Sequence, residues 1–358
     1  AEREVVAVKV QHPHLRETVP ADVRTIRWIA RLAPWVLPDV NLEWLVDETE
    51  RGIAAEMDFI KEAKNCERTR KAFAGNVDVV VPAVRWGLTT SRVFVMEFIE
   101  NAVPMTRRDF YLDNPGVSRK RVAKTLVEVF AQMSFVDGFV HCDPHAGNIL
   151  IRRKPGGREG DFELAILDHG LYRELGDPFV RTYCNMWKSV IFQDFAGLRR
   201  AAEELGVPGM EHFIGMVVFN RPVSAGGVGM MGLSSRARPE DVKKFVESFR
   251  DGTVELTEVL SFLEVVPRDL LLVSKTNNLI RSAMRSMETD VNRFVVSGRA
   301  AIDGSYHVEM RFAAREGWMK RCRIRLQYAY DLLRFWAEAY VLLPLVSLFV
   351  PDHPMAHM

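Results

Sequence analysis

Two short polar segments, each beside an apolar stretch, constrain this chain more than any other feature of its sequence. The first is Gly138–Leu150 (GFVHCDPHAGNIL) and the second is Leu167–Tyr172 (LDHGLY). Asp143 and Asn148 share the first loop, and Asp168 ends the next apolar strand. This pattern suits one task, in which Asp143 orients or deprotonates a hydroxyl while Asn148 and Asp168 supply oxygen ligands to Mg²⁺ carrying nucleotide phosphates. Two ordinary polar turns are the alternative.

A lysine inside an apolar strand fits the same task. In Val5–Val10 (VVAVKV), Lys9 shares a face with Val5 and Ala7, so its ammonium is expected to be enclosed and to need a partner. The helical stretch EMDFIKE supplies Glu56 and Glu62. They lie about 240° apart around a helix, so both cannot face one lysine. If Glu62 pairs with Lys9, Glu56 faces something else; a solvated charged helix face is the alternative.

The order of elements, with strands first and helices after, predicts an α+β protein of two lobes. Helical spacing from Asp22 to Phe73, with breaks near Pro34 and Pro38, suggests two helices. Val77–Val84 and Val93–Ile99 are expected to be paired strands. Beyond these, we predict a helix over Arg119–Gly138, short strands over Phe139–His141, Ile149–Arg152 and Phe162–Leu167, and a Gly/Ser-rich loop over Val223–Pro239.

Composition sets the broad class. The chain has 358 residues, of which 48% are hydrophobic and 27% charged, which excludes wholesale disorder and allows two or three structural units or one bilobal unit. Because 48 basic residues face 47 acidic ones, a general nucleic-acid binder is not expected. The four cysteines form no C-x-x-C pair, which favours a reducing compartment and argues against structural zinc.

The two ends carry separate expectations. The chain opens at Ala1 with a strand almost at once, so we expect its N-terminus to be truncated. The apolar run Ala339–Val350, broken by Pro344, is short for a membrane span and suits a core helix, a membrane-surface segment or a partner-docking segment. The basic stretch Arg315–Arg325 suits either an anionic lipid surface or a solvated helix face.

Taken in order along the chain, these motifs resemble those of the UbiB/AarF (ABC1-type) atypical protein-kinase-like family, in its mitochondrial AarF-domain-containing kinase branch. The resemblance covers most of the chain, and it is carried by VAVKV, EMDFIKEAKN, VFVMEFIE, GFVHCDPHAGNIL, LDHGLY and VPRDLLLVSKTNNLIR. It implies a bilobal protein-kinase-like fold that binds ATP and Mg²⁺ between its lobes. The N-lobe would hold an antiparallel sheet, N-terminally truncated, and the C-lobe would be largely helical. The implied divisions are a partial N-lobe with inserted helices over 1–100, a C-lobe over 101–310 and a helical extension over 311–358.

The resemblance also implies a role for each motif residue. Lys9 would contact nucleotide phosphates and pair with Glu62, and Glu97 would begin the hinge that holds the adenine. Glu56 and Asp58 would form the family's regulatory Glu-x-Asp element, which contacts a Lys-x-Gly-Gln motif in a segment before Ala1. The catalytic aspartate and the two metal ligands would be Asp143, Asn148 and Asp168.

The implied function is that of an atypical kinase or ATPase. Few residues separate Gly170 from Pro178 and no A-P-E follows, which favours a small-molecule role or ATPase activity over protein phosphorylation. Family analogy points to mitochondrial lipid or quinone homeostasis, or to a plastid in a photosynthetic source. Two alternatives remain open: a weakly active pseudokinase-like scaffold, and a metal-dependent hydrolase using His141, Asp143, His145, Asp168 and His169.

Overall fold

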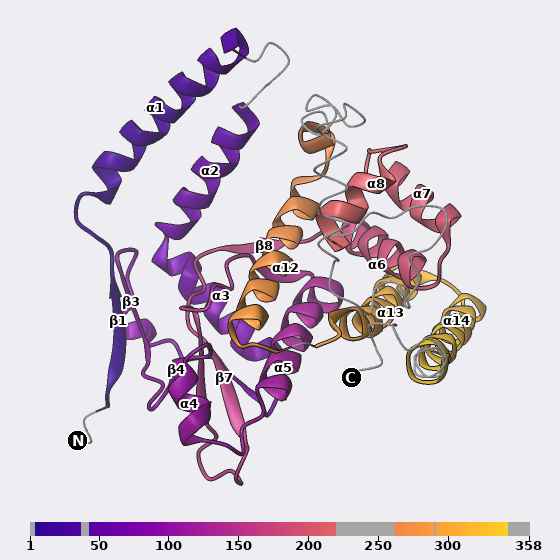
Figure 1. Cartoon of the computed structure of the whole chain (residues 1–358). Helices are drawn as coiled ribbons and strands as arrows, with labels where there is room; N and C mark the ends of the chain where they lie inside the picture. Colours follow the sequence, from indigo (N-terminus) through magenta and orange to yellow (C-terminus); the bar gives the residue numbers. More distant parts are fainter. Residues whose placement is uncertain (1–3, 37–42, 220–261, 290, 343–358) are drawn as a thin grey trace. The chain divides into compact units, whose positions relative to one another are not determined.

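The computed structural model describes residues 4–36, 43–219, 262–289 and 291–342 (Figure 1). The chain divides into two compact units, each assembled from separate stretches of sequence. Unit 1 comprises residues 1–123, 141–172 and 279–289, and unit 2 comprises residues 124–140, 173–278 and 290–358. Every residue predicted to carry chemistry belongs to unit 1.

The strand that carries Lys9 opens unit 1, as predicted. β1 (Val6–Val10) pairs antiparallel with β3 (Val93–Glu97), and Lys9 lies opposite Phe94. Val8 and Val10 are exposed whereas Lys9 and its neighbour Ala7 are half-buried, so the alternation of a strand places the lysine on the enclosed side.

The described residues between 15 and 72 form three helices rather than the predicted two. They are α1 (Leu15–Val36), α2 (Glu43–Glu56) and α3 (Phe59–Ala72). α1 and α2 lie side by side as a hairpin, with Val23, Ala30 and Val46 buried between them (Figure 1). The missed break is at Asp58, whose carboxylate accepts hydrogen bonds from the first backbone N–H groups of α3 and so starts a new helix.

A four-stranded sheet completes the β-structure of unit 1, in the order β2-β7-β6-β4. These strands are β2 (Val79–Val80), β7 (Phe162–Ile166), β6 (Ile149–Arg153) and β4 (Val103–Pro104). The predicted strands over 149–152 and 162–167 are confirmed as an antiparallel pair. The predicted pairing of 77–84 with 93–99 is wrong, apart from one bridge between Val84 and Met96 in the described chain. β2 instead pairs in parallel with β7. Pro82, which lacks an N–H, interrupts the segment between β2 and the bridge residue Val84.

Strand pairing also brings the two polar loops together. β5 (Phe139–His141), predicted from sequence, pairs with β8 (Tyr172–Glu174). The Leu167 N–H donates to the Asn148 carbonyl at 3.0 Å, and the Cys142 N–H donates to the Leu171 carbonyl at 2.9 Å. Each bond joins one polar segment to the other, so Asp143, Asn148 and Asp168 are held in neighbouring loops.

Helices make up most of the described part of unit 2. The helix predicted over 119–138 is confirmed: α5 (Arg119–Ala131) continues as the π-helical turn Gln132–Asp137 and ends at Gly138, in the left-handed conformation with φ 60°. Further α-helices of the described residues include α4 (Arg108–Asp113, in unit 1), α6 (Asp177–Ile191), α7 (Phe195–Glu204), α8 (Glu211–Ile214), α12 (Arg268–Ser286, whose residues from 279 on belong to unit 1), α13 (Arg293–Phe312) and α14 (Trp318–Ala337).

The core of unit 2 is built around α13, which packs against α6, α14 and the π-helical turn. A side chain at Gly304 of α13 would overlap the Phe135 carbonyl, so only glycine permits this approach. Phe135, Tyr183 and Trp187 form a buried aromatic cluster beside it. None of the described helices is both long and apolar enough to cross a bilayer. The predicted loop over 223–239 and most of the apolar run 339–350 lie outside the described residues.

Candidate functional site

A buried ion pair forms the centre of the candidate site. The Lys9 ammonium lies 2.8 and 3.0 Å from the two carboxylate oxygens of Glu62 and 3.4 Å from Oδ2 of Asp168. The Glu62 side chain is 1% exposed and the Lys9 side chain 38%. The Lys9–Glu62 pairing predicted from sequence is therefore present, and it joins β1 to the first turn of α3.

The charges of this group are set by burial and by each other. Burial alone would lower the pKa of Lys9, but the carboxylates of Glu62 and Asp168 outweigh it and raise that pKa. Burial would likewise raise the pKa of Asp168, but the Gly170 N–H, which donates to Oδ1 at 2.9 Å, and the Lys9 charge lower it. Burial raises the pKa of Glu62 despite its pairing with Lys9. At neutral pH Lys9 therefore carries its positive charge beside an ionised Asp168.

Asn148 and Asp168 have the donor chemistry that Mg²⁺ requires. The Asn148 amide nitrogen donates to the Asp143 carbonyl at 3.3 Å, which leaves its amide oxygen as the atom it can offer to a cation. The Asp168 side chain is 34% exposed and ionised. Carboxylate and amide oxygens are hard ligands of the kind Mg²⁺ takes alongside phosphates and water, so these residues fit the ion.

Asp143 lies in a tight turn between β5 and β6. The His145 N–H donates to the Asp143 carbonyl and the Asn148 N–H donates to the His145 carbonyl, both at 2.9 Å. Asp143 is half-buried. The turn therefore fixes the spacing of Asp143 and Asn148, the two loop residues singled out in the sequence.

Glu56 lies beside the second polar loop. A Cβ built on Gly170 would lie 3.7 Å from Cγ of Glu56 and 3.3 Å from Oδ1 of Asp168. Glu56 and Glu62 face different groups, as expected, because Glu62 bonds Lys9 while the exposed Glu56 lies next to Gly170. The single helix assumed for the two residues is wrong, since Glu56 ends α2 and Glu62 lies in the first turn of α3.

Asp58 and Glu97 have local backbone partners. Asp58 caps α3, as described above. One carboxylate oxygen of Glu97 accepts from the Ala83 N–H at 3.1 Å, while the Glu97 N–H donates to the Ala83 carbonyl at 2.8 Å. The regulatory role implied for Asp58 and the adenine-binding role implied for Glu97 stay predictions.

Asn65 is a site residue that the sequence reasoning missed. Its amide donates to the His169 carbonyl at 3.0 Å, while Glu62 accepts from the His169 N–H at 3.3 Å. α3 thus forms hydrogen bonds with both the N–H and the carbonyl of His169, the residue that follows Asp168. The three-residue spacing of Glu62 and Asn65, which puts both on one helix face, is the signal that could have found it.

Two fully buried histidines flank the loops, stacked with Tyr172. The ring centroids of His141 and His169 lie 5.1 and 5.6 Å from that of Tyr172. The His169 ring nitrogens lie 3.0 Å from the Tyr172 hydroxyl and 3.0 Å from the Ile166 carbonyl. Burial lowers the pKa of His141 to about 4 and that of His169 to about 3, so both are neutral at pH 7. Across the described residues, no group of three or more His, Cys, Asp and Glu side chains is arranged to hold a metal.

The sequence of this chain is similar to those of known kinase-like proteins, in agreement with the geometry of the site. Residues 1–202 match the sequence model of the ABC1 atypical kinase-like domain. The chain is 31% identical over 334 residues to AarF domain-containing kinase 1 of Drosophila melanogaster, covering 92% of this chain and 62% of that protein. It is 31% identical over 331 residues to AarF domain-containing protein kinase 1 of Mus musculus, covering 91% and 61%. The ABC1 family protein MCP2 homolog of Schizosaccharomyces pombe is 32% identical over 353 residues, covering 94% and 62%. The chain thus spans about three fifths of the length of these relatives.

A solved structure supports the fold. The structure of Rv3197 from Mycobacterium tuberculosis, in complex with erythromycin, matches 82% of this chain and 70% of that chain with a TM-score of 0.52 at 18% identity. The α+β, bilobal kinase-like fold expected from sequence is therefore confirmed. With a family match over more than half of its length, and relatives of the same family along most of it, the chain belongs to the ABC1 atypical kinase-like domain family.

Proposed function

We propose that this chain binds Mg²⁺–ATP in unit 1 and acts as an atypical kinase or ATPase. The observation that carries the proposal is Lys9, held by the buried Glu62 within 3.4 Å of Asp168, the carboxylate proposed as metal ligand. A lysine fixed by a helix glutamate beside a metal-binding aspartate is the arrangement that phosphoryl transfer needs.

Each side chain has a definite task in this proposal. Lys9 contacts the nucleotide phosphates, while Asn148 and Asp168 hold Mg²⁺, which when bound neutralises charge on the phosphate oxygens. Asp143 orients the attacking hydroxyl or water and accepts its proton. Glu97 begins the adenine-binding hinge, and Glu56 and Asp58 form the regulatory element.

The acceptor is proposed to be a small molecule or water rather than a protein. β8 and the N-terminus of α6 follow Gly170 directly, with α6 starting at Asp177. This leaves little chain for the long activation segment with which protein kinases dock peptides. By family analogy we propose a role in lipid or quinone homeostasis, in the mitochondrion or, in a photosynthetic source, a plastid. The apolar run 339–350 and the basic stretch 315–325 before it lead us to propose peripheral membrane contact through the C-terminal segment as well.

Nucleotide binding is tested by thermal unfolding with ATP, with and without Mg²⁺. The wild-type chain is expected to show a Mg²⁺-dependent rise in Tm that Asp168→Asn abolishes, because the variant loses a ligand charge. Asp113→Asn, an exposed carboxylate on α4, is the matched control and should behave as wild type. A rise that is equal with and without Mg²⁺, or unchanged in Asp168→Asn, would contradict the metal role.

Turnover is tested by phosphate release and transfer from ATP. Asp143→Asn should lower kcat by at least about a hundredfold while preserving the Mg²⁺–ATP thermal shift, because it removes a group that acts in the transition state. Nucleotide binding with no turnover in the wild-type chain would favour the pseudokinase-like scaffold. Activity in Asp143→Asn equal to that of wild type would refute the mechanism.

A further inference from the structure

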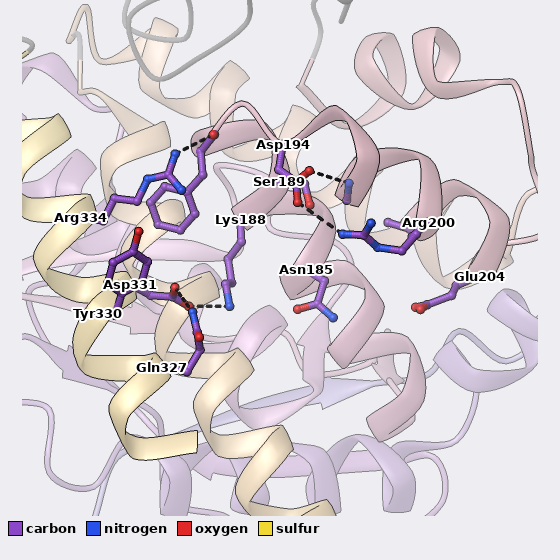
Figure 2. Close-up of a pocket in the computed structure, with 13 residues that line it drawn as sticks. Asn185, Lys188, Ser189, Asp194, Arg200, Glu204, Gln327, Tyr330, Asp331 and Arg334 are labelled. Carbon is purple, nitrogen blue, oxygen red and sulfur yellow. Dashed lines mark hydrogen bonds and ion pairs between the residues drawn. The ribbon is translucent and has the colours of Figure 1, made fainter. Parts of the chain in front are cut away.

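α14 carries two opposite faces, and one of them anchors the helix to unit 2. On the buried face, Asp331 lies 2.6 Å from Lys188 of α6, at the wall of a cavity of about 370 Å³ between α6, α7 and α14 (Figure 2). Arg334 donates to the Phe192 carbonyl at 2.9 Å, with its guanidinium over the Phe192 ring. These contacts fix the rotation of α14 about its axis.

The opposite face is apolar and exposed to solvent. Met319, Leu326 and Leu333 are 70%, 72% and 69% exposed. Large aromatic residues extend the same surface at both ends and in the middle: Trp318, Trp336 and Tyr330, the last of which also borders the cavity. At about 100° per residue these six side chains fall within an arc of about 120°, centred about 180° from Asp331 and Phe335. We call this set the α14 apolar face; contiguous exposed apolar side chains of this kind are typical of interaction sites.

Basic residues border the α14 apolar face on both sides. By the same helical count, Arg321 and Arg325 flank one edge and Arg323 the other. All three are exposed, and none makes an ion pair within the described part of the chain. Lys320, further round, is paired with Glu316, and the acidic Asp331 is buried on the other side. The exposed surface therefore combines apolar side chains with uncompensated positive charge.

The combination of apolar and basic side chains on α14 indicates an anionic lipid surface as the partner. A helix with Trp and Leu on one face and arginines along its edges is suited to lie at an anionic lipid surface, where aromatic rings sit at headgroup level and guanidinium groups meet phosphates. A second copy of the chain would instead bring the same arginines face to face, and like charges oppose association.

We propose that the α14 apolar face docks the protein peripherally on an anionic lipid bilayer, with Leu326 and Leu333 entering the acyl boundary and Arg321, Arg323 and Arg325 binding lipid phosphates. This deepens the membrane contact within the proposed function, and it does not depend on ATP binding or turnover.

The test is flotation of the full chain with vesicles. The probes are vesicles of phosphatidylcholine alone and of phosphatidylcholine mixed with phosphatidylglycerol. Wild type should bind the mixed vesicles in a salt-sensitive manner and bind the neutral ones weakly. Leu326→Gln/Leu333→Gln should weaken partitioning by about tenfold or more, because two buried leucine side chains are lost. Arg321→Gln/Arg323→Gln/Arg325→Gln should remove the preference for anionic vesicles.

Matched variants elsewhere control for composition. Leu88→Gln/Leu112→Gln replaces two leucines of similar exposure, and Arg92→Gln/Arg153→Gln/Arg199→Gln replaces three exposed arginines. Both should bind vesicles as wild type does.

Two results would overturn the proposal. One is the absence of vesicle binding, and a dimer in light scattering that Leu326→Gln/Leu333→Gln dissociates would then assign the face to a second copy of the chain. The other is equal vesicle binding by the α14 variants and the control variants. The Mg²⁺–ATP thermal shift of the α14 variants should equal that of wild type, so a failure of membrane docking is distinguishable from a failure of nucleotide binding.

Discussion

At the scale of single residues, the backbone of His169 is the point where α3 and the Asp168 loop are joined. Glu62 accepts from its N–H and Asn65 donates to its carbonyl. Asn65 touches neither Lys9 nor Asp168 in the hydrogen bonds observed, so it is a positioning residue. Its bond restricts where Asp168 can present its carboxylate.

Asn65→Asp tests this role, because it replaces the amide donor by an oxygen that faces the His169 carbonyl. Losing the buried bond is expected to lower the free energy of unfolding by about 1–3 kcal/mol. It should also weaken the Mg²⁺-dependent Tm shift with ATP, which a purely structural residue would not do. Urea unfolding and thermal shift measure the two effects. Asn101→Asp, at an exposed position, is the control; an Asn65→Asp variant that matches it would disprove the positioning role.

The two buried histidines predict acid sensitivity. Their pKa values are lowered to about 4 for His141 and about 3 for His169, from 6.5 in the unfolded chain. Below pH 6.5 the unfolded state therefore binds more protons than the folded state, and stability is lost as pH falls towards 4. Each histidine should cost about 2 kcal/mol between pH 7 and pH 5.

His169→Phe should remove about half of this loss, because phenylalanine keeps a planar ring but cannot be protonated. The measurement is the free energy of unfolding by urea at pH 7 and pH 5, compared as a difference so that any constant effect of the substitution cancels. His145→Phe, at an exposed histidine, should keep the full wild-type dependence. An unchanged pH dependence in His169→Phe would show that His169 does not remain neutral in the folded state.

At the scale of elements, α6 and α14 are joined by the Lys188–Asp331 ion pair, with side chains 18% and 7% exposed. The cavity beside it is lined by charges that are largely paired within its own wall, such as Arg200 with Asp194 (Figure 2). The pair therefore serves to anchor α14.

Lys188→Met should be strongly destabilising, by about 3–5 kcal/mol, because it leaves Asp331 buried without its cation. The double variant Lys188→Met/Asp331→Leu should recover most of this loss, since neither charge then remains. Lys320→Met removes a lysine from an exposed pair on the same helix and should change stability by less than about 1 kcal/mol. The free energy of unfolding in urea is measured for the three variants. A double variant as unstable as Lys188→Met would show that Lys188→Met destabilises the protein through lost packing rather than through the unpaired charge of Asp331.

At the scale of the whole molecule, each unit is built from segments far apart in sequence. β2 and β4 have their partners in β7 and β6, which lie beyond residue 140. A fragment of residues 1–123 therefore lacks most of its sheet and is not expected to fold. Circular dichroism and urea unfolding of this fragment should show no cooperative transition, whereas the full chain should show one. A cooperative transition in the fragment would contradict this dependence.

Whether a feature of the fold or site could be predicted from the sequence depends on how far apart along the chain its interacting residues lie. The strand carrying Lys9, the Glu62 pairing and the polar loops were predictable, because alternation, helical spacing and short motifs are local signals. The partners of β2 and β3 were not, because strand pairing depends on residues that are distant in sequence. Asn65 escaped notice because its bond to His169 exists only in the tertiary structure. In α14 the basic run was visible in the sequence, but exposure of the apolar side chains required knowing which face Asp331 and Phe335 bury.

The interleaving of the two units has an evolutionary consequence. The chain passes between them five times, after residues 123, 140, 172, 278 and 289. A recombination event that exchanges one contiguous gene segment cannot transfer one whole unit without also carrying part of the other. Exchange of a single unit between genes, as occurs with domains that are contiguous in sequence, is therefore not open to this chain, and the Lys9–Glu62–Asp168 group is tied in inheritance to the unit that carries α14.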